Sequence, residues 1–150
     1  MEKKEKQTKS NNKKVRKNYS ERWFLLNAQG KILGKVAAVA AKALLAKADP
    51  SSRGFETPDW RVVVINAAKV AVTGRKEENK KYYRYSGYPG GLRQTTLEKL
   101  RESKPAEIIT HAVYGMLPKN RRGKAIRRHL FVYPEGTHPH EAQKLEDLEV

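Results

Sequence analysis

The six residues from Arg61 to Asn66 narrow the folds open to this chain more than any other segment. The run is short, apolar and β-branched, which is typical of a strand covered on both faces in a parallel sheet. The bulky run from Trp23 to Leu26 predicts an earlier strand. Between the two, a rotation of 100° per residue gathers an apolar set on one broad helical arc, namely Ile32, Val36, Val39, Ala40, Ala43 and Leu44. Strand, helix and strand in this order imply a right-handed βαβ unit, and therefore a layered α/β domain.

Shorter elements are predicted around and after this unit. By composition, residues 49–59 form a loop, and Lys69 to Thr73 is a second strand candidate that stops at Gly74. Thr95 with Glu98 would form a capping box for a short helix in which Leu97 and Leu100 face inward.

A longer helix is predicted from Pro105, which is well placed as a first helical residue because its missing N–H is not needed there. Gly115 and Pro118 end this helix. Leu130 to Tyr133 predicts a last short strand, and the tail from Glu141 turns acidic. The core face of the helix follows the i, i+4, i+8 spacing through Ile108, Ile109, Ala112, Val113 and Met116.

The charge of the chain points to nucleic acid as its partner. The 150 residues carry a formal net charge of +16 and a pI near 10.1, so the protein attracts polyanions, and counterion release would make that binding weaken steeply with salt. The absence of cysteine removes thiol chemistry and disulfides, which permits a reducing compartment. No apolar run approaches the roughly 18 residues needed to cross a bilayer, and the N-terminus lacks a secretory signal. A cytoplasmic protein fits these observations best.

Residues 1–21 are rich in Lys, Asn, Gln and Ser and hold almost nothing apolar, which predicts a disordered basic arm. A solubilising tail and an RNA-threading segment both remain open for this arm. An organellar transit peptide fits less well, because Glu2, Glu5 and Glu21 lie in it. Residues 22–150 would then form one domain.

The segment from Arg75 to Arg93 alternates cations with tyrosines and ends in a Pro-Gly-Gly turn. Cations can neutralise phosphates, tyrosine rings can stack on unpaired bases, and glycines let the backbone approach a sugar–phosphate chain. We expect about half of the tyrosines to belong to the core instead. The residues assigned to RNA here are Arg75, Lys76, Lys80, Lys81, Tyr82, Arg84, Tyr85, Gly90, Gly91 and Arg93.

A second candidate RNA surface follows the stop formed by Gly115 to Lys119. The run from Lys119 to Arg128 contains no acidic residue, so a polyanion would relieve its self-repulsion. Its assigned residues are Lys119, Arg121, Arg122, Lys124, Arg127 and Arg128. A stripe on the first helix adds Lys31 and Lys35 as candidates, although such stripes are often merely solvated.

Three other patterns do not support a catalytic, nucleotide or metal site. The segment from Gly30 to Lys35 has three residues between its glycines, not the four of a phosphate-binding loop, and Val36 replaces the Ser or Thr that would hold magnesium. His138-Pro139-His140 is interpreted as a rigid surface turn, because a structural metal site usually needs four suitable ligands. No carboxylate, serine or histidine stands out in a cleft-forming loop. We therefore expect no enzyme activity and no cofactor.

Ordered motifs from Trp23 to the C-terminus resemble the ribosomal protein L13 family of the large subunit. They are Gly30-Lys31-Ile32-Leu33-Gly34-Lys35, Val64-Ile65-Asn66-Ala67, Val72-Thr73-Gly74, Lys81-Tyr82, Ser86-Gly87, Pro89-Gly90-Gly91, Ala112-Val113, Gly115-Met116-Leu117-Pro118-Lys119, Val132-Tyr133, His138-Pro139-His140 and Ala142-Gln143. The resemblance implies a three-layer α/β/α domain around a four-stranded parallel sheet, and a non-enzymatic role in binding large-subunit (23S-type) rRNA during assembly. It also implies ribosomal proteins L20, L21 and L3 as neighbours, in a ribosome of bacterial or organellar type.

The chain departs from the family pattern in the segment from Ala46 to Gly54. After this segment, it retains only Thr57-Pro58 and Asp59 of the pattern. Tyr114 also stands where a lysine is common, and Arg122 where a leucine is common. Two alternatives to a ribosomal role are a free RNA-binding regulator of translation and an RNA-modifying enzyme with a Rossmann-like sheet. The enzyme would need a glycine pattern that Asn27 to Gly30 does not provide.

Overall fold

The structure is a computed structural model that describes residues 21–47 and 58–150. Of the arm predicted over residues 1–21, only Glu21 lies within the described residues, and most of the loop predicted over residues 49–59 lies outside them. The Trp23 indole N–H donates to the Glu21 carboxylate, which also forms an ion pair with Arg61, so Glu21 belongs to the folded domain.

Four parallel strands form the main sheet, as predicted. They are β1 (Arg22–Asn27), β2 (Trp60–Ile65), β5 (Leu130–Val132) and β6 (Leu145–Leu148), in the order β5-β2-β1-β6. Strand β1 pairs with β2 on one side and with β6 on the other, so Trp23 lies opposite both Arg61 and Leu145. The β-branched run of β2 is buried at Val62, Val63 and Val64, which is why a continuous apolar segment is needed at this central position. Strand β6 was missed in the sequence.

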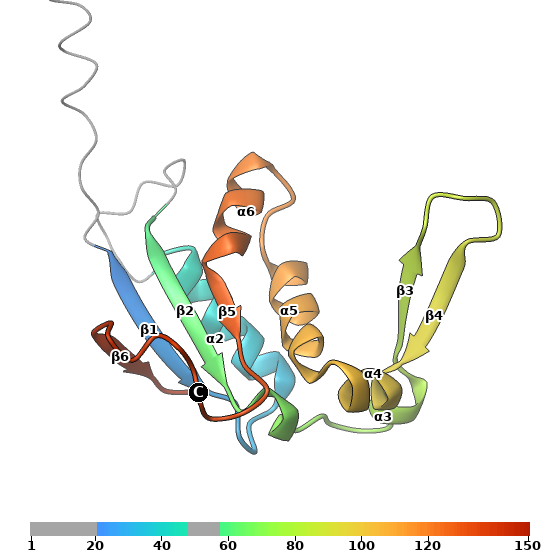
Figure 1. Cartoon of the computed structure of the whole chain (residues 1–150), viewed down its shortest axis with the longest axis horizontal. Helices are drawn as coiled ribbons and strands as arrows, with labels where there is room; N and C mark the ends of the chain where they lie inside the picture. The colour runs from blue at the N-terminus through green and yellow to red at the C-terminus, as the bar shows by residue number, and fades with distance from the viewer. Residues whose placement is uncertain (1–20, 48–57) are drawn as a thin grey trace, which may run out of the picture.

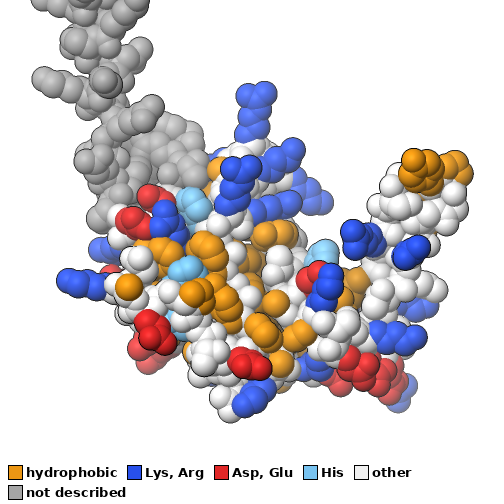
Figure 2. Space-filling view, viewed as in Figure 1, with side chains coloured by type: hydrophobic (Ala, Val, Ile, Leu, Met, Phe, Trp, Pro, Cys, Tyr) orange, Lys and Arg blue, Asp and Glu red, His pale blue; other side chains and the backbone are white. Residues whose placement is uncertain are grey.

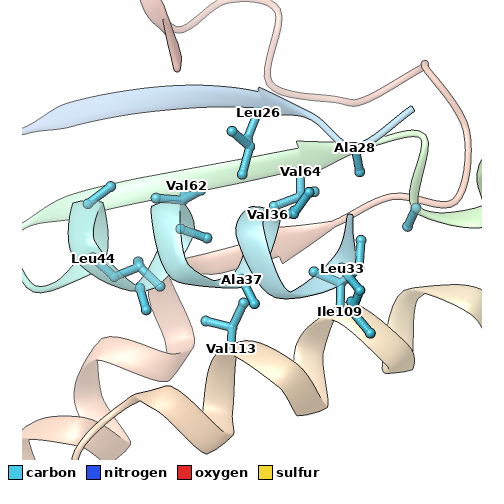
Figure 3. Packing of buried hydrophobic residues seen from close by; sticks show 14 of the residues in the cluster. Leu26, Ala28, Leu33, Val36, Ala37, Leu44, Val62, Val64, Ile109 and Val113 are labelled. Carbon is cyan, nitrogen blue, oxygen red and sulfur yellow. The ribbon is translucent and has the colours of Figure 1, made fainter. Parts of the chain in front are cut away.

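Helices α2 (Leu33–Leu44) and α5 (Pro105–Met116) pack together against one face of the sheet (Figures 1 and 3). Figure 3 shows Val36 of α2 directed toward the sheet and Ala37 beside Val113 of α5. The small residues of α2 let the two helices approach closely, and each fully buried aliphatic side chain contributes about 1.5–3 kcal/mol. The sheet and its helices agree with the predicted three-layer α/β/α class. None of the helices in the described part of the chain has the length and hydropathy of a membrane-crossing helix.

The opposite face of the sheet carries an aromatic cluster. The Trp23 ring stacks on Phe131 at 5.8 Å and lies 5.0 Å from His140, and the C-terminal segment that supplies His140 crosses this face (Figure 1). The Tyr133 hydroxyl and His140 Nε2 form a hydrogen bond of 2.9 Å. His138-Pro139-His140 was predicted as a rigid surface turn, and the structure adds that His140 anchors this turn to the sheet.

The stability of this cluster should depend on pH. Burial, with smaller contributions from His138 and Arg61, lowers the pKa of His140, so the folded state favours the neutral ring. The unfolded chain then binds more protons as pH falls below about 6.5, and the free energy of unfolding decreases over that range. We expect the Tm to fall more between pH 7.5 and 5.5 in the wild type than in His140→Phe, which keeps a ring without a titrating group. Equal falls in both proteins would contradict this prediction.

A two-stranded antiparallel hairpin extends from the body (Figure 1). It consists of β3 (Lys81–Tyr85) and β4 (Leu92–Thr96), flanked by α3 (Lys76–Asn79) and α4 (Leu97–Ser103). Helix α6 (Arg121–Ile126) and the 3-10 turns η1 (Ala67–Lys69) and η2 (Arg127–His129) complete the described elements. The sequence did not predict this hairpin.

Four local predictions were wrong. Instead of a strand from Lys69 to Thr73 there is the η1 turn followed by one isolated bridge between Ala71 and Ile32. Thr95 lies in β4, and the helix cap is Thr96, whose side chain makes no capping bond. Ile32 and Met116 were placed on core faces but are exposed, because Ile32 is the N-cap residue of α2 and Met116 is the last residue of α5. The other core predictions held for Leu97, Leu100, Ile108, Ile109 and Val113, and Pro105 begins α5.

Candidate nucleic-acid interface

The hairpin is held by a tight glycine-containing tip. The Ser86 amide donates to the Gly91 carbonyl at 3.2 Å, and the Gly91 amide donates to the Tyr88 carbonyl at 2.9 Å. A side chain at Gly91 would overlap Ser86 and the Tyr88 carbonyl, and Gly90 has a positive φ of 74°. The glycines predicted to approach RNA are therefore also needed to close the turn.

The strand register divides the hairpin into two faces. Tyr83 lies opposite Gln94, and Tyr85 lies opposite Leu92, so these residues share one face. Tyr83, Tyr85 and Leu92 are 62%, 63% and 61% exposed, which leaves a large apolar surface open to a partner. In Figure 2, side chains of the hydrophobic class, which includes tyrosine, gather at the hairpin tip.

The other hairpin face turns toward the body. Its Tyr82 ring lies 5.5 Å from His111 of α5 and 5.4 Å from the Lys80 ammonium group. Burial raises the pKa of Tyr82, so its hydroxyl keeps its proton over the physiological range. Of the four tyrosines in the segment from Arg75 to Arg93, Tyr82 alone is half-buried, so fewer of them belong to the core than the half we expected.

The second basic surface is built on α6. The Asn120 side chain caps α6 by accepting from the Gly123 amide at 2.8 Å. Gly123 packs so closely against the Pro118 carbonyl that any Cβ at this position would overlap the oxygen. The segment from Gly115 to Lys119, predicted to end the preceding helix, therefore packs directly against α6 through Pro118.

The predicted RNA-binding residues of this second surface fall into two groups. The exposed group is Lys119, Arg121, Lys124 and Arg128. Arg122 and Arg127 are half-buried, and the Arg127 guanidinium lies 4.8 Å above the Tyr114 ring, whose hydroxyl donates to the Arg127 carbonyl. Arg127 therefore helps to fix η2 on the body.

Both basic surfaces rise on the same side of the molecule, and Figure 2 shows the surface hollowed between them. Within residues 21–47 and 58–150, the ion pairs described use Arg61, Arg101 and Lys104. The exposed cations of α6 and the hairpin form no ion pair with any carboxylate of that part of the chain, which leaves their charge available to an external polyanion.

The remaining predicted residues lie near a smaller groove of about 340 Å³ between α2, α3 and α5. Lys76 and Lys80 line this groove together with Gly34 and His111. Lys35 and Arg75 are exposed, and each is next in sequence to a residue that lines the groove. The Lys31 ammonium group contacts the Val150 carbonyl at 3.5 Å. No group of three or more metal-binding side chains is placed together in the described residues.

Comparison with known proteins decides the family. The model of the ribosomal protein L13 family matches residues 21–139, which contain three of the four strands of the main sheet, the hairpin and the basic run. The chain belongs to the ribosomal protein L13 family. This membership places it among structural proteins of the ribosome and not among enzymes, which confirms the non-enzymatic role predicted from the sequence.

Relatives within the L13 family resemble this chain over most of its length, and each is named large ribosomal subunit protein uL13. The protein of Lawsonia intracellularis is 50% identical over 126 residues, covering 83% of this chain and 87% of the relative. That of Caldanaerobacter subterraneus subsp. tengcongensis is 48% identical over 130 residues, covering 86% and 90%. That of Thermus thermophilus is 45% identical over 144 residues, covering 91% and 97%.

The departures from the L13 pattern now have a partial explanation. At position 114, where lysine is common, this chain has a tyrosine whose ring packs against the Arg127 guanidinium and whose hydroxyl donates to the Arg127 carbonyl. Arg122 is half-buried, in keeping with a position where leucine is common. Of the divergent segment from Ala46 to Gly54, only Ala46 and Lys47 lie within the described residues.

Three exposed residues of the hairpin were not among the residues assigned to RNA from the sequence. Tyr83, Tyr88 and Leu92 are more than 60% exposed at the hairpin, and none was assigned to RNA. The two-residue spacing of Tyr83 and Tyr85 carried a usable signal, because residues i and i+2 of a strand share a face. Leu92 carried no such signal, since its exposure follows from the pairing register of β4.

The cap of α6 offers a test of how firmly the basic helix of this L13 chain is held. Asn120→Ala should lower the free energy of unfolding by about 1 kcal/mol, because the Gly123 amide loses its acceptor. Thr96→Ala is the matched control, since the Thr96 side chain makes no capping bond, and its effect should be below about 0.5 kcal/mol. Urea unfolding of the two variants measures both values. A larger effect for Thr96→Ala would contradict the prediction.

Proposed function

We propose that this protein is a structural constituent of the large ribosomal subunit that binds large-subunit (23S-type) rRNA and supports subunit assembly. The observation that carries the proposal is the pair of basic surfaces on one side of the domain, whose exposed cations have no carboxylate partner within the described residues. A surface of unpaired cations repels itself, and neutralisation by phosphates removes that repulsion. The printed names of the relatives support the same assignment.

In this proposal the α/β body is a rigid platform for two RNA contacts. The hairpin contributes exposed rings for unpaired bases, hydroxyl groups that can contact ribose, and cations. The α6 surface contributes cations on a helix that is capped and packed against Pro118. Affinity would come mainly from charge, and specificity from the shape of the folded RNA.

The same proposal extends to partners and location. Ribosomal proteins L20, L21 and L3 are the neighbours we propose, in a ribosome of the cytoplasm, with an organellar ribosome as the other setting. The exposed face of Tyr83, Tyr85 and Leu92 is large enough to take part in such protein contacts as well as in base stacking.

Sucrose-gradient fractionation of a native lysate, at moderate and at high salt, tests the proposal. We expect near-stoichiometric recovery of the protein with large subunits at both salt concentrations. Recovery mostly in the light fractions would contradict the structural role and would favour a free RNA-binding regulator of translation.

A further inference from the structure

The two strands of the hairpin place two arginines directly opposite each other. Arg84 of β3 pairs in register with Arg93 of β4. Residues directly opposite in an antiparallel pair share a face, and their Cβ atoms lie about 4.5–5.5 Å apart. Like charges in this arrangement destabilise a hairpin. The guanidinium group of neither arginine makes a hydrogen bond or ion pair within the described residues.

Of this arginine pair, Arg84 lines a groove, and Arg93 lies opposite it on the neighbouring strand. Tyr82 lies two residues before Arg84 and therefore on the same face of β3. It pairs with Thr95 and packs against His111 of α5. The groove has a volume of about 610 Å³ and runs between the hairpin and helices α4 and α5. Its lining residues include Tyr82, Arg84, Thr95, Ser103, Lys104 and Glu107.

The charges in the groove favour an anion at its hairpin side. Glu107 of α5 is the one carboxylate among the lining residues, and it forms an ion pair at 3.3 Å with Lys104, the residue just before this helix. Hydroxyl groups of Tyr82, Thr95 and Ser103 supply polar contacts, and the Tyr82 hydroxyl is buried without a partner in the described residues. An oxygen-rich anion that accepts from two guanidinium groups and lies near hydroxyl groups has the chemistry of a phosphodiester with its ribose.

We propose that Arg84 and Arg93 share a single backbone phosphate of an RNA strand that enters the groove between the hairpin and helices α4 and α5. This inference rests on the proposed function and deepens it, because it assigns one phosphate to one pair of residues. The bound phosphate turns a repulsive cross-strand pair into an attractive one. The hairpin would therefore be less stable in the free protein than in the RNA complex.

Sharing of one phosphate predicts non-additive effects of substitution. The variants Arg84→Gln, Arg93→Gln and the double variant are titrated with a large-subunit rRNA transcript over a range of salt concentrations. Each single variant should bind about 5- to 10-fold more weakly and lose about 0.7–0.9 from the slope of log K against log salt. The double variant should lose little more than either single one, because the same contact has already been broken. Lys144→Gln, an exposed lysine outside the groove, is the control and should leave the slope unchanged.

A second measurement separates binding from a merely structural role. Amide hydrogen exchange of the free proteins should show greater protection of β3 and β4 in each single variant than in the wild type, because the repulsion between the arginines is removed. A structural role for the arginines would give the opposite change. Thermal unfolding of the same samples confirms that each variant is folded.

The possible outcomes distinguish this inference from the proposed function. A wild-type protein that does not bind the rRNA transcript overturns both. Wild-type binding with unchanged binding by all three arginine variants overturns the shared-phosphate site alone. Losses that add fully in the double variant show two separate phosphates, and they also overturn it. Poly-glutamate is tested beside the rRNA transcript as a competing polyanion that is not a nucleic acid. The inference is overturned if the arginine variants lose their affinity for poly-glutamate but keep their affinity for rRNA.

Discussion

Gly123→Ala is expected to destabilise the protein by about 3 kcal/mol and to displace α6 from the body. The added Cβ would overlap the carbonyl oxygen of Pro118, which is backbone and cannot rotate away as a flexible side chain could. The helix must shift as a whole, and its exposed cations shift with it. Chemical unfolding measures the loss of stability, and rRNA binding by the folded variant measures the displacement, which should weaken binding about tenfold or more.

Gly115→Ala provides the matched control in the same motif. A Cβ at Gly115 meets no atom within 4 Å, and this glycine lies inside helix α5. Alanine should therefore stabilise the protein by about 0.5–1 kcal/mol, since it lowers the backbone entropy of the unfolded chain. Similar stabilities for the two variants would show that α6 can yield without loss, and the close packing at Pro118 would then not fix the basic surface.

The second large effect is expected from neutralising the exposed cations of α6 and η2. The triple variant Arg121→Gln, Lys124→Gln and Arg128→Gln leaves the half-buried Arg122 and Arg127 in place, so the packing against Tyr114 is retained. If each cation neutralises one phosphate, the slope of log K against log salt should fall by about 2–3, and affinity for rRNA should fall on the order of 100-fold near physiological salt.

A control of equal charge separates this local effect from the overall charge of the protein. The triple variant Lys47→Gln, Lys69→Gln and Lys144→Gln removes the same three charges from exposed positions outside the two basic surfaces. It should change the slope by less than about 1, through the long-range field alone. Equal slopes for the two triple variants would remove α6 from the RNA interface.

The central part of the fold could be predicted because its local sequence and its tertiary environment agree. The central residues of β2 are all apolar, so the strand can be recognised without knowing which of its faces is buried. Pro105 marks the start of α5 through its local backbone preference alone. The burial of Ile108, Ile109 and Val113 follows from helical periodicity alone. The errors at Ile32 and Met116 lie at helix ends, where one residue of uncertainty moves a side chain from the core to the surface.

Three strands could not be predicted, because β6 pairs with a strand far away in the sequence and because β3 and β4 lack a buried face. Strand β6 holds Glu146 and Asp147 between its two leucines, and it becomes a strand only because β1 offers a free edge. Strands β3 and β4 are exposed along nearly their whole length, so they lack the alternation of apolar and polar residues that marks a half-buried strand. Composition still predicted an RNA surface over residues 75–93, since that prediction depended on residue types and not on their arrangement.

The difference in burial between Arg121 and Arg122 also could not be predicted from the sequence. Both belong to one acid-free run, but α6 turns Arg122 toward the body and leaves Arg121 in solvent. Which arginine packs and which stays free depends on where the helix begins, and that is set by Asn120 and Pro118.

The place of β6 at the edge of the sheet has a consequence for the timing of synthesis. Strand β1 is the first described strand to leave the exit tunnel of the translating ribosome, yet its second neighbour comes from the last described strand. One edge of β1 therefore stays open until the residues of β6 have been made, and the four-stranded sheet closes only after that point. Nascent chains halted before Leu145 should thus be held by chaperones or cut by proteases at β1, whereas released chains should resist both.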